Sequence, residues 1–258
     1  MKNNKLLIAN WKINMSFEQT INYITSNYDE LINLPIKTKT KIILCPSAIE
    51  LYTAKQILKD TPIYIGAQNC SKYLRGAFTG EISVINLNNI GCQYCIIGHS
   101  ERRINYHETN TDIVQKLENL IDYSISPIIC IGENKNDYEN KKTIPILEKQ
   151  LQPILDKIKI ISTLPEYLEI CIAYEPVWSI GTGQIAEIPH LETIFSWLNE
   201  TIQKISSVIN FKLIYGGSVD PESIKILSKI EGIDGFLIGG SSCNFQDFEK
   251  IVNLVGNN

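Results

Sequence analysis

Short apolar runs recur along the whole chain, and more polar segments separate them. Within each run the apolar residues are continuous, which is typical of strands that are covered on both faces, as in a parallel sheet. The pattern therefore predicts eight parallel strands. The runs lie at residues 5–10, 41–46, 62–67, 93–98, 127–132, 169–174, 211–217 and 235–240.

Most segments between these runs predict amphipathic helices, because their apolar residues recur at steps of three and four positions. Ser16 and Ser47 stand where N-caps are expected, and Asp220 does so directly before Pro221. We expect helices over residues 16–33, 47–59, 103–122, 145–159, 187–207, 221–230 and 243–254.

Two segments depart from this alternation. Residues 67–92 form a long polar loop with room for a short helix before the fourth strand. Loops of that length inside a compact domain are usually functional. Residues 133–142, "ENKNDYENKK", are dense in charge and are expected to form a solvated surface connection.

Eight strands that alternate with helices over 258 residues fit an α/β protein of the closed (β/α)8 barrel type. An open doubly wound sheet usually has fewer strands and carries G-x-G-x-x-G after the first one, where this chain has no such motif. No linker or low-complexity segment divides the chain. We therefore expect a single (β/α)8 domain over residues 1–258.

Charge and hydropathy argue against several kinds of partner. The 24 basic and 28 acidic residues give a net charge of −4 with no basic stripe, so nucleic acid is a poor candidate. No apolar run approaches the length of a signal peptide's core or a membrane span. We expect a cytoplasmic protein that does not bind membranes.

The seven cysteines lie mostly in apolar runs, which suits free buried thiols in a reducing compartment. Cys92 and Cys95 match C-x-x-C, but Cys95 continues into an apolar run and does not open a helix, which argues against a redox site. No Cys/His cluster has zinc spacing, so no metal is expected.

Residues directly after the strands are the candidates for chemistry, because barrel enzymes place their active sites there. Glu175 precedes Pro176, which keeps it extended at the end of the sixth strand. His99 stands where the fourth strand gives way to a helix that would begin near Ser100, and the dipole at a helix N-terminus favours a neutral imidazole. Taken alone, Glu175 also fits a structural ion pair, His99 a ring satisfied by neighbouring backbone, and Lys12 a solvated charge.

Two glycine pairs suggest a phosphate site. Gly216-Gly217-Ser218 and Gly239-Gly240-Ser241 follow the seventh and eighth strands, where barrels frequently bind phosphate. Glycine lets backbone N–H groups approach an anion closely. Tight turns explain one such pair equally well, but two adjacent pairs favour the anion site. A nucleotide P-loop is excluded because no G-x-x-x-x-G-K-[ST] motif occurs.

Four segments resemble the triosephosphate isomerase family, and their order and spacing cover essentially the whole chain. They are "ANWK" at 9–12, "IIGHSERR" at 96–103, "AYEPVWSIGTG" at 173–183 and "YGGSV" at 215–219, supported by "GAQN", "GAFTGEIS" and "CIGE". The resemblance implies a TIM barrel. It also implies an enzyme of glycolysis and gluconeogenesis that interconverts dihydroxyacetone phosphate and D-glyceraldehyde 3-phosphate through an enediolate, with no metal or organic cofactor.

The resemblance assigns the chemistry to four residues. It makes Glu175 the base that moves the carbon-bound proton and neutral His99 the group that polarises the carbonyl. Lys12 would supply positive charge, Asn10 would hold Lys12 and the substrate, and Glu101 would belong to the same network. The reaction needs such donors because a carboxylate removes a proton α to a carbonyl only if the developing oxyanion is stabilised.

The resemblance also assigns a lid, a phosphate site and a dimer contact. Residues 176–183 would close over the substrate and bring the Gly181 amide to the phosphate. Tyr215 and Ser218 would latch the closed lid. The 67–83 loop would insert into the partner of a homodimer, with Thr79 reaching toward the partner's Asn10 and Glu101. The expected phosphate ligands are Asn10, Lys12, Gly181, Ser218, Gly239 and Gly240.

Some features depart from the family pattern, and two rival functions stay open. "GGSSC" at 239–243, the charged 133–143 region and Ile13 differ from the common sequences and leave dimer strength and lid kinetics open. A Schiff-base aldolase would need a lysine in mid-strand, whereas Lys5, Lys41 and Lys212 lie near strand starts. A non-catalytic barrel that binds a phosphorylated metabolite or a protein partner is the alternative from another class.

Overall fold

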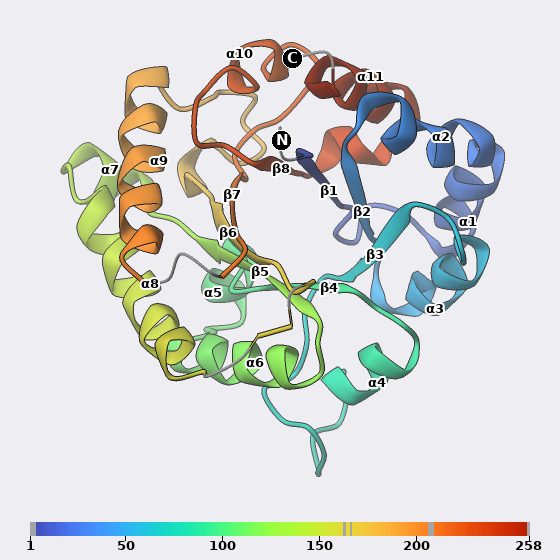
Figure 1. Ribbon diagram of the computed structural model, residues 1–258, viewed down its shortest axis with the longest axis horizontal. Coiled ribbons are helices and arrows are strands. Elements are labelled where there is room, and N and C mark those ends of the chain that lie inside the picture. Colours follow the sequence, from blue (N-terminus) through green and yellow to red (C-terminus); the bar gives the residue numbers. More distant parts are fainter. Residues whose placement is uncertain (1–3, 162–163, 166, 206–208, 257–258) are drawn as a thin grey trace.

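The computed structural model describes residues 4–161, 164–165, 167–205 and 209–256, and its strands form a closed barrel surrounded by helices (Figure 1). The strands are parallel, each pairs with the next along the chain, and β8 pairs with β1. The (β/α)8 barrel is thus confirmed. The strands are β1 (Leu6–Asn10), β2 (Lys41–Cys45), β3 (Ile63–Ala67), β4 (Tyr94–Ile97), β5 (Ser126–Ile131), β6 (Ile170–Tyr174), β7 (Phe211–Tyr215) and β8 (Gly235–Ile238).

The strands are buried on both faces, as their continuous apolar sequences predict. In β6, Cys171 and Ala173 belong to the cluster inside the barrel, whereas Ile170, Ile172 and Tyr174 belong to the larger cluster under the helices. Successive side chains of a strand point to opposite faces. If this alternation continues beyond β6, the residue two positions after Ala173 also faces the barrel interior.

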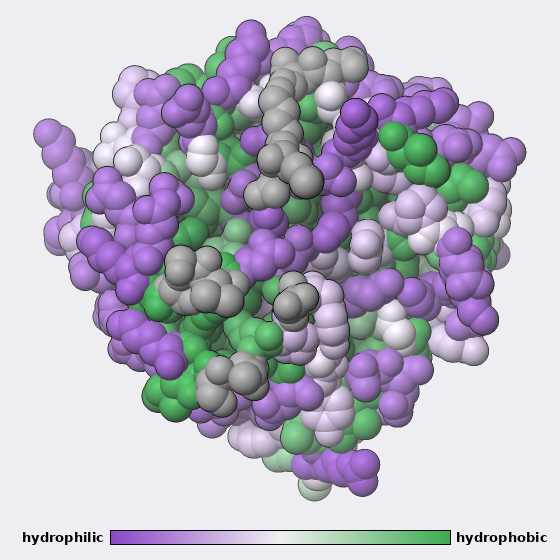
Figure 2. All heavy atoms as spheres, in the orientation of Figure 1, coloured by the Kyte–Doolittle hydropathy of each residue, from purple (hydrophilic) through white to green (hydrophobic). Residues whose placement is uncertain are grey.

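The longer helices surround the barrel and bury one face each. In α11 (Phe245–Gly256), the buried residues are Phe248, Ile251, Val252 and Val255. Seen from the same side as Figure 1, hydrophilic residues dominate the rim, with smaller hydrophobic groups between them (Figure 2). The longer helices are α1 (Phe17–Ser26), α2 (Tyr28–Thr38), α3 (Ala48–Ile57), α6 (Asn110–Asp122), α8 (Thr143–Ile160), α9 (Ile188–Gln203) and α11 (Phe245–Gly256). The shorter ones are α4 (Val84–Asn89), α5 (Ser100–Asn105), α7 (Lys135–Glu139), α10 (Ile224–Leu227) and the 3-10 turns η1 (Val177–Ser179) and η2 (Gly240–Cys243).

Two predicted helices are each divided into two. The 16–33 helix is interrupted at Asn27, whose φ of −118° and ψ of 23° leave the helical region. The 103–122 helix is interrupted before Thr109. Thr109 and Asp112 form a capping box at the start of α6, in which the Thr109 hydroxyl accepts from the Asp112 amide and the Asp112 side chain accepts from the Thr109 amide. His107, at a positive φ of 57°, lies in this break. Ser16 caps α1 in the same reciprocal way, as predicted.

Other local predictions need correction. Residues 133–142 are not simply a solvated connection, because they contain α7 and because Glu133 at their start is 1% exposed. The Asp220 carboxylate accepts two amide hydrogen bonds, as a cap would, but α10 begins only at Ile224. The short helix expected before the fourth strand is present as α4. No helix in the described ranges is long and apolar enough to cross a membrane.

Candidate active site

One cavity at the carboxyl ends of the strands gathers most of the predicted site residues. It has a volume of about 220 Å³ and also borders the loop after β6. It is not lined by Lys5, Lys41 or Lys212, the lysines considered above for a Schiff-base aldolase. The predicted residues that line it are Asn10, Lys12, His99, Glu175, Gly181, Ser218, Gly239 and Gly240.

Glu175 is buried at the end of β6, with 1% of its surface exposed. Its amide donates to the Ile131 carbonyl at 2.8 Å, which keeps it in line with the strand. Its Oε2 accepts from the Ser100 amide at 3.0 Å, and its Oε1 lies 3.1 Å from His99 Nε2. The carboxylate is therefore positioned by β4 and α5 as well as by its own strand.

Two glycines and a thiol shape the space around Glu175. A Cβ at Gly132 would overlap the Glu175 carbonyl, and a Cβ at Gly216 would come within 2.9 Å of Glu175 Cγ. Burial raises the pKa of the Cys130 thiol well above its ordinary value, and the nearby Glu175 carboxylate raises it further. The thiol thus stays protonated, and the glycines let Glu175 sit against the backbone directly after β5 and β7.

His99 is the N-cap of α5, as its position before Ser100 predicts. Its Nδ1 accepts from the Glu101 amide at 3.3 Å, and its ring is 6% exposed. In an uncharged ring whose Nδ1 accepts a hydrogen bond, the proton is on Nε2. That nitrogen points at the Glu175 carboxylate.

Lys12 follows β1 in a left-handed backbone conformation, with φ of 51°. Strained positions of this kind cluster at functional sites. The Lys12 amide donates to Asn10 Oδ1 at 3.2 Å, and its ammonium forms an ion pair with Glu101. Gln68 donates to the Lys12 carbonyl at 2.8 Å and so supports this turn. Sequence reasoning did not assign Gln68 a role, although the "GAQN" segment contains it.

The glycine-rich turns present accessible backbone to the cavity. No described atom lies within 4 Å of the place that a Cβ would take at Gly181 or Gly240. The Ser218 hydroxyl donates to the Ser179 carbonyl at 2.5 Å, which joins the turn after β7 to the loop after β6. Tyr215 is buried beside Ser179 and does not line the cavity, and burial raises the pKa of its hydroxyl.

Thr79 lies away from the cavity, exposed in the loop between β3 and α4 that projects from the barrel (Figure 1). Near the tip, the rings of Tyr73 and Phe78 stack with centroids 3.7 Å apart and planes 3° apart. The two rings are 41% and 40% exposed. The loop therefore presents a preformed aromatic surface outside the body of the protein.

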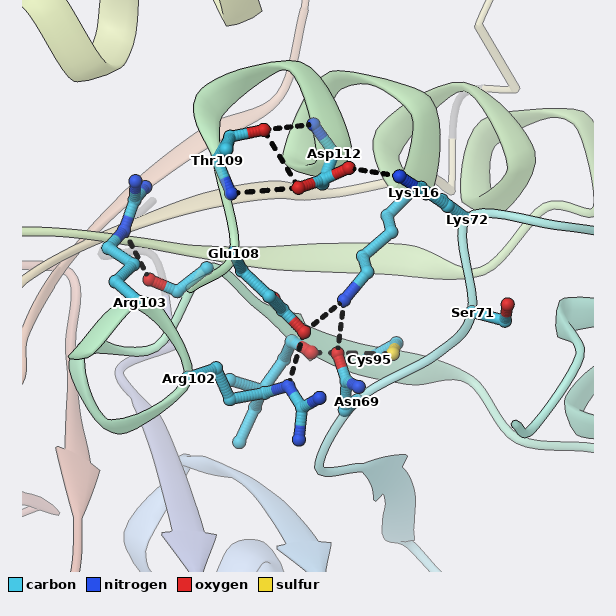
Figure 3. A network of polar contacts seen from close by, with 12 residues as sticks. Asn69, Ser71, Lys72, Cys95, Arg102, Arg103, Glu108, Thr109, Asp112 and Lys116 are labelled. Atoms are coloured by element: carbon cyan, nitrogen blue, oxygen red, sulfur yellow. Dashed lines mark hydrogen bonds and ion pairs between the residues drawn. The ribbon is translucent and has the colours of Figure 1, made fainter. Parts of the chain in front are cut away.

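A polar network fastens the base of this loop to α5 and α6 (Figure 3). Lys116 donates to Asn69 at 2.9 Å and to Glu108 at 2.6 Å, and Arg102 donates to the same Glu108 oxygen at 2.5 Å. Arg102 connects the network to His99, because its amide donates to the His99 carbonyl at 2.9 Å. Glu108 and Lys116 escape sequence reasoning because a charged residue inside a helical segment usually indicates a solvated face.

Glu133 is a second buried carboxylate that sequence reasoning missed. Its Oε1 accepts from the Tyr174 hydroxyl at 3.1 Å and from Trp178 Nε1 at 2.9 Å. Burial raises the pKa of Glu133, and these hydrogen bonds oppose the shift. In the described part of the chain, no three His, Cys, Asp or Glu side chains are grouped so as to hold a metal ion.

Comparisons with known proteins agree on one family. The family model "Triosephosphate isomerase" matches residues 5–255. Proteins of that name from Lactobacillus gasseri and Aquifex aeolicus are 36% and 37% identical over 251 residues, which is 96% of this chain and 97% and 98% of theirs. One from Francisella tularensis subsp. mediasiatica is 35% identical over 257 residues, 96% of each chain.

Proposed function

The chain belongs to the triosephosphate isomerase family and is an isomerase, and we propose that it interconverts dihydroxyacetone phosphate and D-glyceraldehyde 3-phosphate. The proposed reaction moves one proton between adjacent carbons through an enediolate and needs no cofactor. The observation that carries the proposal is the contact of the buried Glu175 carboxylate with His99 Nε2, 3.1 Å apart, on the wall of one cavity.

Glu175 is the proposed base. It removes the proton from the carbon next to the carbonyl and returns it to the neighbouring carbon. Its support comes from the Ser100 amide, which holds one carboxylate oxygen, while the other lies against His99 Nε2. A carboxylate fixed within contact of the carbon loses little orientational freedom in the transition state, which favours proton transfer.

His99 and Lys12 are the proposed stabilisers of the enediolate. Because Nδ1 accepts from the Glu101 amide, a neutral His99 carries its proton on Nε2 and donates it to a substrate oxygen. Lys12 supplies the fixed positive charge, positioned by Asn10 and Glu101. Preorganised donors aimed at a developing oxyanion are each worth about 10²–10³ in rate.

The phosphate would bind at Ser218 and the amides of Gly239 and Gly240, with Asn10 and Lys12 as its further ligands; the Lys12 side chain lies beside Gly239. Segment 176–183 is the proposed lid, and its Gly181 amide would join the phosphate when the lid closes. Closure would exclude water from the enediolate, which otherwise eliminates phosphate. The bond from Ser218 to Ser179 and the position of Tyr215 beside Ser179 support their role as a latch.

A homodimer built through the 67–83 loop is the proposed assembly. A cavity of about 460 Å³ opens beside the active site, lined by Asn10, Lys12 and Glu101 and by Ile82 of the loop's own base. Thr79 of the partner subunit would enter there. Ile13, 91% exposed at the rim of this cavity, would be covered in the dimer. Light scattering should give twice the monomer mass of 29.2 kDa.

The proposed place of action is the cytoplasm, in glycolysis and gluconeogenesis, as a single (β/α)8 domain.

The test of the proposed activity is a coupled assay of D-glyceraldehyde 3-phosphate isomerisation with the purified chain and Glu175→Gln. We expect rapid turnover by the wild type and a loss of about 10³-fold or more in the variant. A wild type that binds phosphorylated ligands without turnover would favour the non-catalytic barrel instead.

A further inference from the structure

Trp178 stands at the start of the lid and is held on two sides. Its indole Nε1 donates to Glu133 at 2.9 Å. Its ring stacks on Tyr138 of α7, with centroids 4.3 Å apart and planes 27° apart. Stacked aromatic pairs contribute about 0.5–1.5 kcal/mol beyond their buried area. The first turn of the lid is therefore fastened to the segment after β5.

His190 of α9 completes this cluster. Its Nε2 lies 2.9 Å from the Tyr174 hydroxyl, and its ring meets Tyr138 edge to face at 5.0 Å. The Tyr174 hydroxyl already donates its only proton to Glu133. His190 Nε2 must therefore be the donor to Tyr174, so a directed chain of hydrogen bonds runs from α9 through β6 to the residue that holds Trp178.

The other end of the lid lacks such contacts. Gly181 and Gly183 have positive φ values of 70° and 73°, and no described atom lies within 4 Å of a Cβ built on either. Only Pro176 and Val177 separate Trp178 from Glu175, and the Val177 amide donates to the Glu133 carbonyl at 3.1 Å. The fixed end of the lid is thus also the backbone that follows the proposed base.

We propose that Tyr138 and His190 are positioning residues for the isomerisation, an inference that rests on the proposed function. They hold Trp178, and through Trp178 they fix the backbone of Glu175 while the glycine end of the lid moves. Because the base acts only in the transition state, its misplacement lowers kcat more than it raises KM.

Protonation of His190 should make its effect on kcat depend on pH, which a ring that only fills space would not do. The groups that face His190 are Tyr174 from β6, Tyr138 from α7 and Glu187 from the start of its own helix, with Glu133 behind Tyr174. Burial lowers the pKa of His190 below 6.5, and Glu187 opposes the shift. A charged ring keeps its Nε2 proton and donates more strongly, so the hold on Trp178 changes below that pH.

The experiment compares Tyr138→Leu, His190→Ala and His190→Gln with the wild type in the coupled isomerase assay. Tyr167→Leu, a tyrosine 70% exposed before β6, is the matched control. Tyr138→Leu and His190→Ala are expected to lower kcat by about tenfold with KM changed by less than about twofold. His190→Gln, whose side-chain amide replaces the Nε2 donor, should retain kcat near pH 7.5. Its kcat relative to the wild type should then change as the pH falls from 7.5 to 5.

Three other results of this assay would contradict the inference or the proposed function. Wild-type turnover with all three variants within about twofold of it at every pH would overturn this inference and leave the proposed function intact. An equal loss in His190→Gln and His190→Ala would show that ring packing matters and the hydrogen bond does not, which would overturn the hydrogen-bond role of His190. A wild type without turnover would overturn both the function and the inference.

Discussion

Two glutamates at opposite ends of β6 face the inside of the same barrel but have different surroundings. Glu169 directly precedes the strand and Glu175 directly follows it, and they are 6% and 1% exposed. The Glu169 carboxylate accepts from the Tyr94 hydroxyl at 2.5 Å and from the Lys41 ammonium at 2.8 Å. The Glu175 carboxylate has one backbone donor and His99, and it lines the cavity.

Burial of a carboxylate therefore does not identify a catalytic residue by itself. At the amino end of the barrel, Lys41 neutralises Glu169, and the pKa of Tyr94 is raised by burial and by the charge of Glu169, so the tyrosine keeps its proton. Such a pair stabilises the fold and offers no group to a substrate. At the carboxyl end, where barrels place their chemistry, Glu175 contacts groups that also line an open cavity.

Shortening the carboxyl-end glutamate should have the largest effect. Glu175→Asp withdraws the carboxylate by about one methylene, and a displacement of about 1 Å costs about 10²-fold or more in rate. We expect kcat to fall by about 10²–10³-fold while the free energy of unfolding changes by less than about 1 kcal/mol. Steady-state kinetics and urea unfolding measure the two quantities. A large loss of stability without loss of kcat would assign Glu175 to the stability of the fold and not to the reaction.

Adding one carbon behind Glu175 should have the next largest effect. In Gly132→Ala the new Cβ overlaps the Glu175 carbonyl, so the backbone of the proposed base must move. We expect kcat to fall by about 10²-fold and stability by about 1–3 kcal/mol. Gly235→Ala is the matched control, because its Cβ overlaps the Leu6 carbonyl at the other end of the barrel. The control should lose stability and keep the kcat of the folded enzyme. Equal kcat in the two variants would contradict the prediction.

The contrast also shows how far sequence reasoning reaches. Continuous apolar runs predict the barrel and place Glu175, His99 and the glycine pairs at one end, because parallel strands all end on the same side. The same reasoning cannot find Glu133, Glu169 or Glu108. Their burial depends on side-chain partners that the strand and helix patterns do not reveal. Trp178 and Lys41 are distant in sequence from Glu133 and Glu169, and Lys116 reaches Glu108 from within α6. Charge in a helical segment or at a strand start is usually solvated, so only the packed structure identifies these exceptions.

Removing the charge at the amino end should affect stability alone. Glu169→Gln leaves the Lys41 ammonium without a counter-charge. Breaking a buried pair costs about 3–5 kcal/mol, but the Lys41 side chain is 24% exposed, so we expect about 2 kcal/mol. Chemical denaturation should record this loss, and kcat per folded molecule should match the wild type. A fall in kcat with unchanged stability would assign Glu169 to the reaction and remove the distinction between the two ends.

The smallest effect is expected at the ion pair between Lys72 and Asp112, which provides a solvent-accessible reference for the two buried glutamates. The bond to Lys72 and the Thr109 hydrogen bonds lower the pKa of Asp112 from 3.8 to about 2, against the effect of burial. Because the folded pKa is the lower one, this stabilisation is complete above pH 3.8 and is lost as the pH falls through 2. Lys72→Met should therefore destabilise only slightly near neutral pH, and the difference from the wild type should shrink between pH 4 and 2. Thermal unfolding over this range checks the prediction. A stability difference that stays constant down to pH 2 would show that Lys72 acts through packing. The ion pair between Lys72 and Asp112 would then contribute almost nothing to the free energy of unfolding.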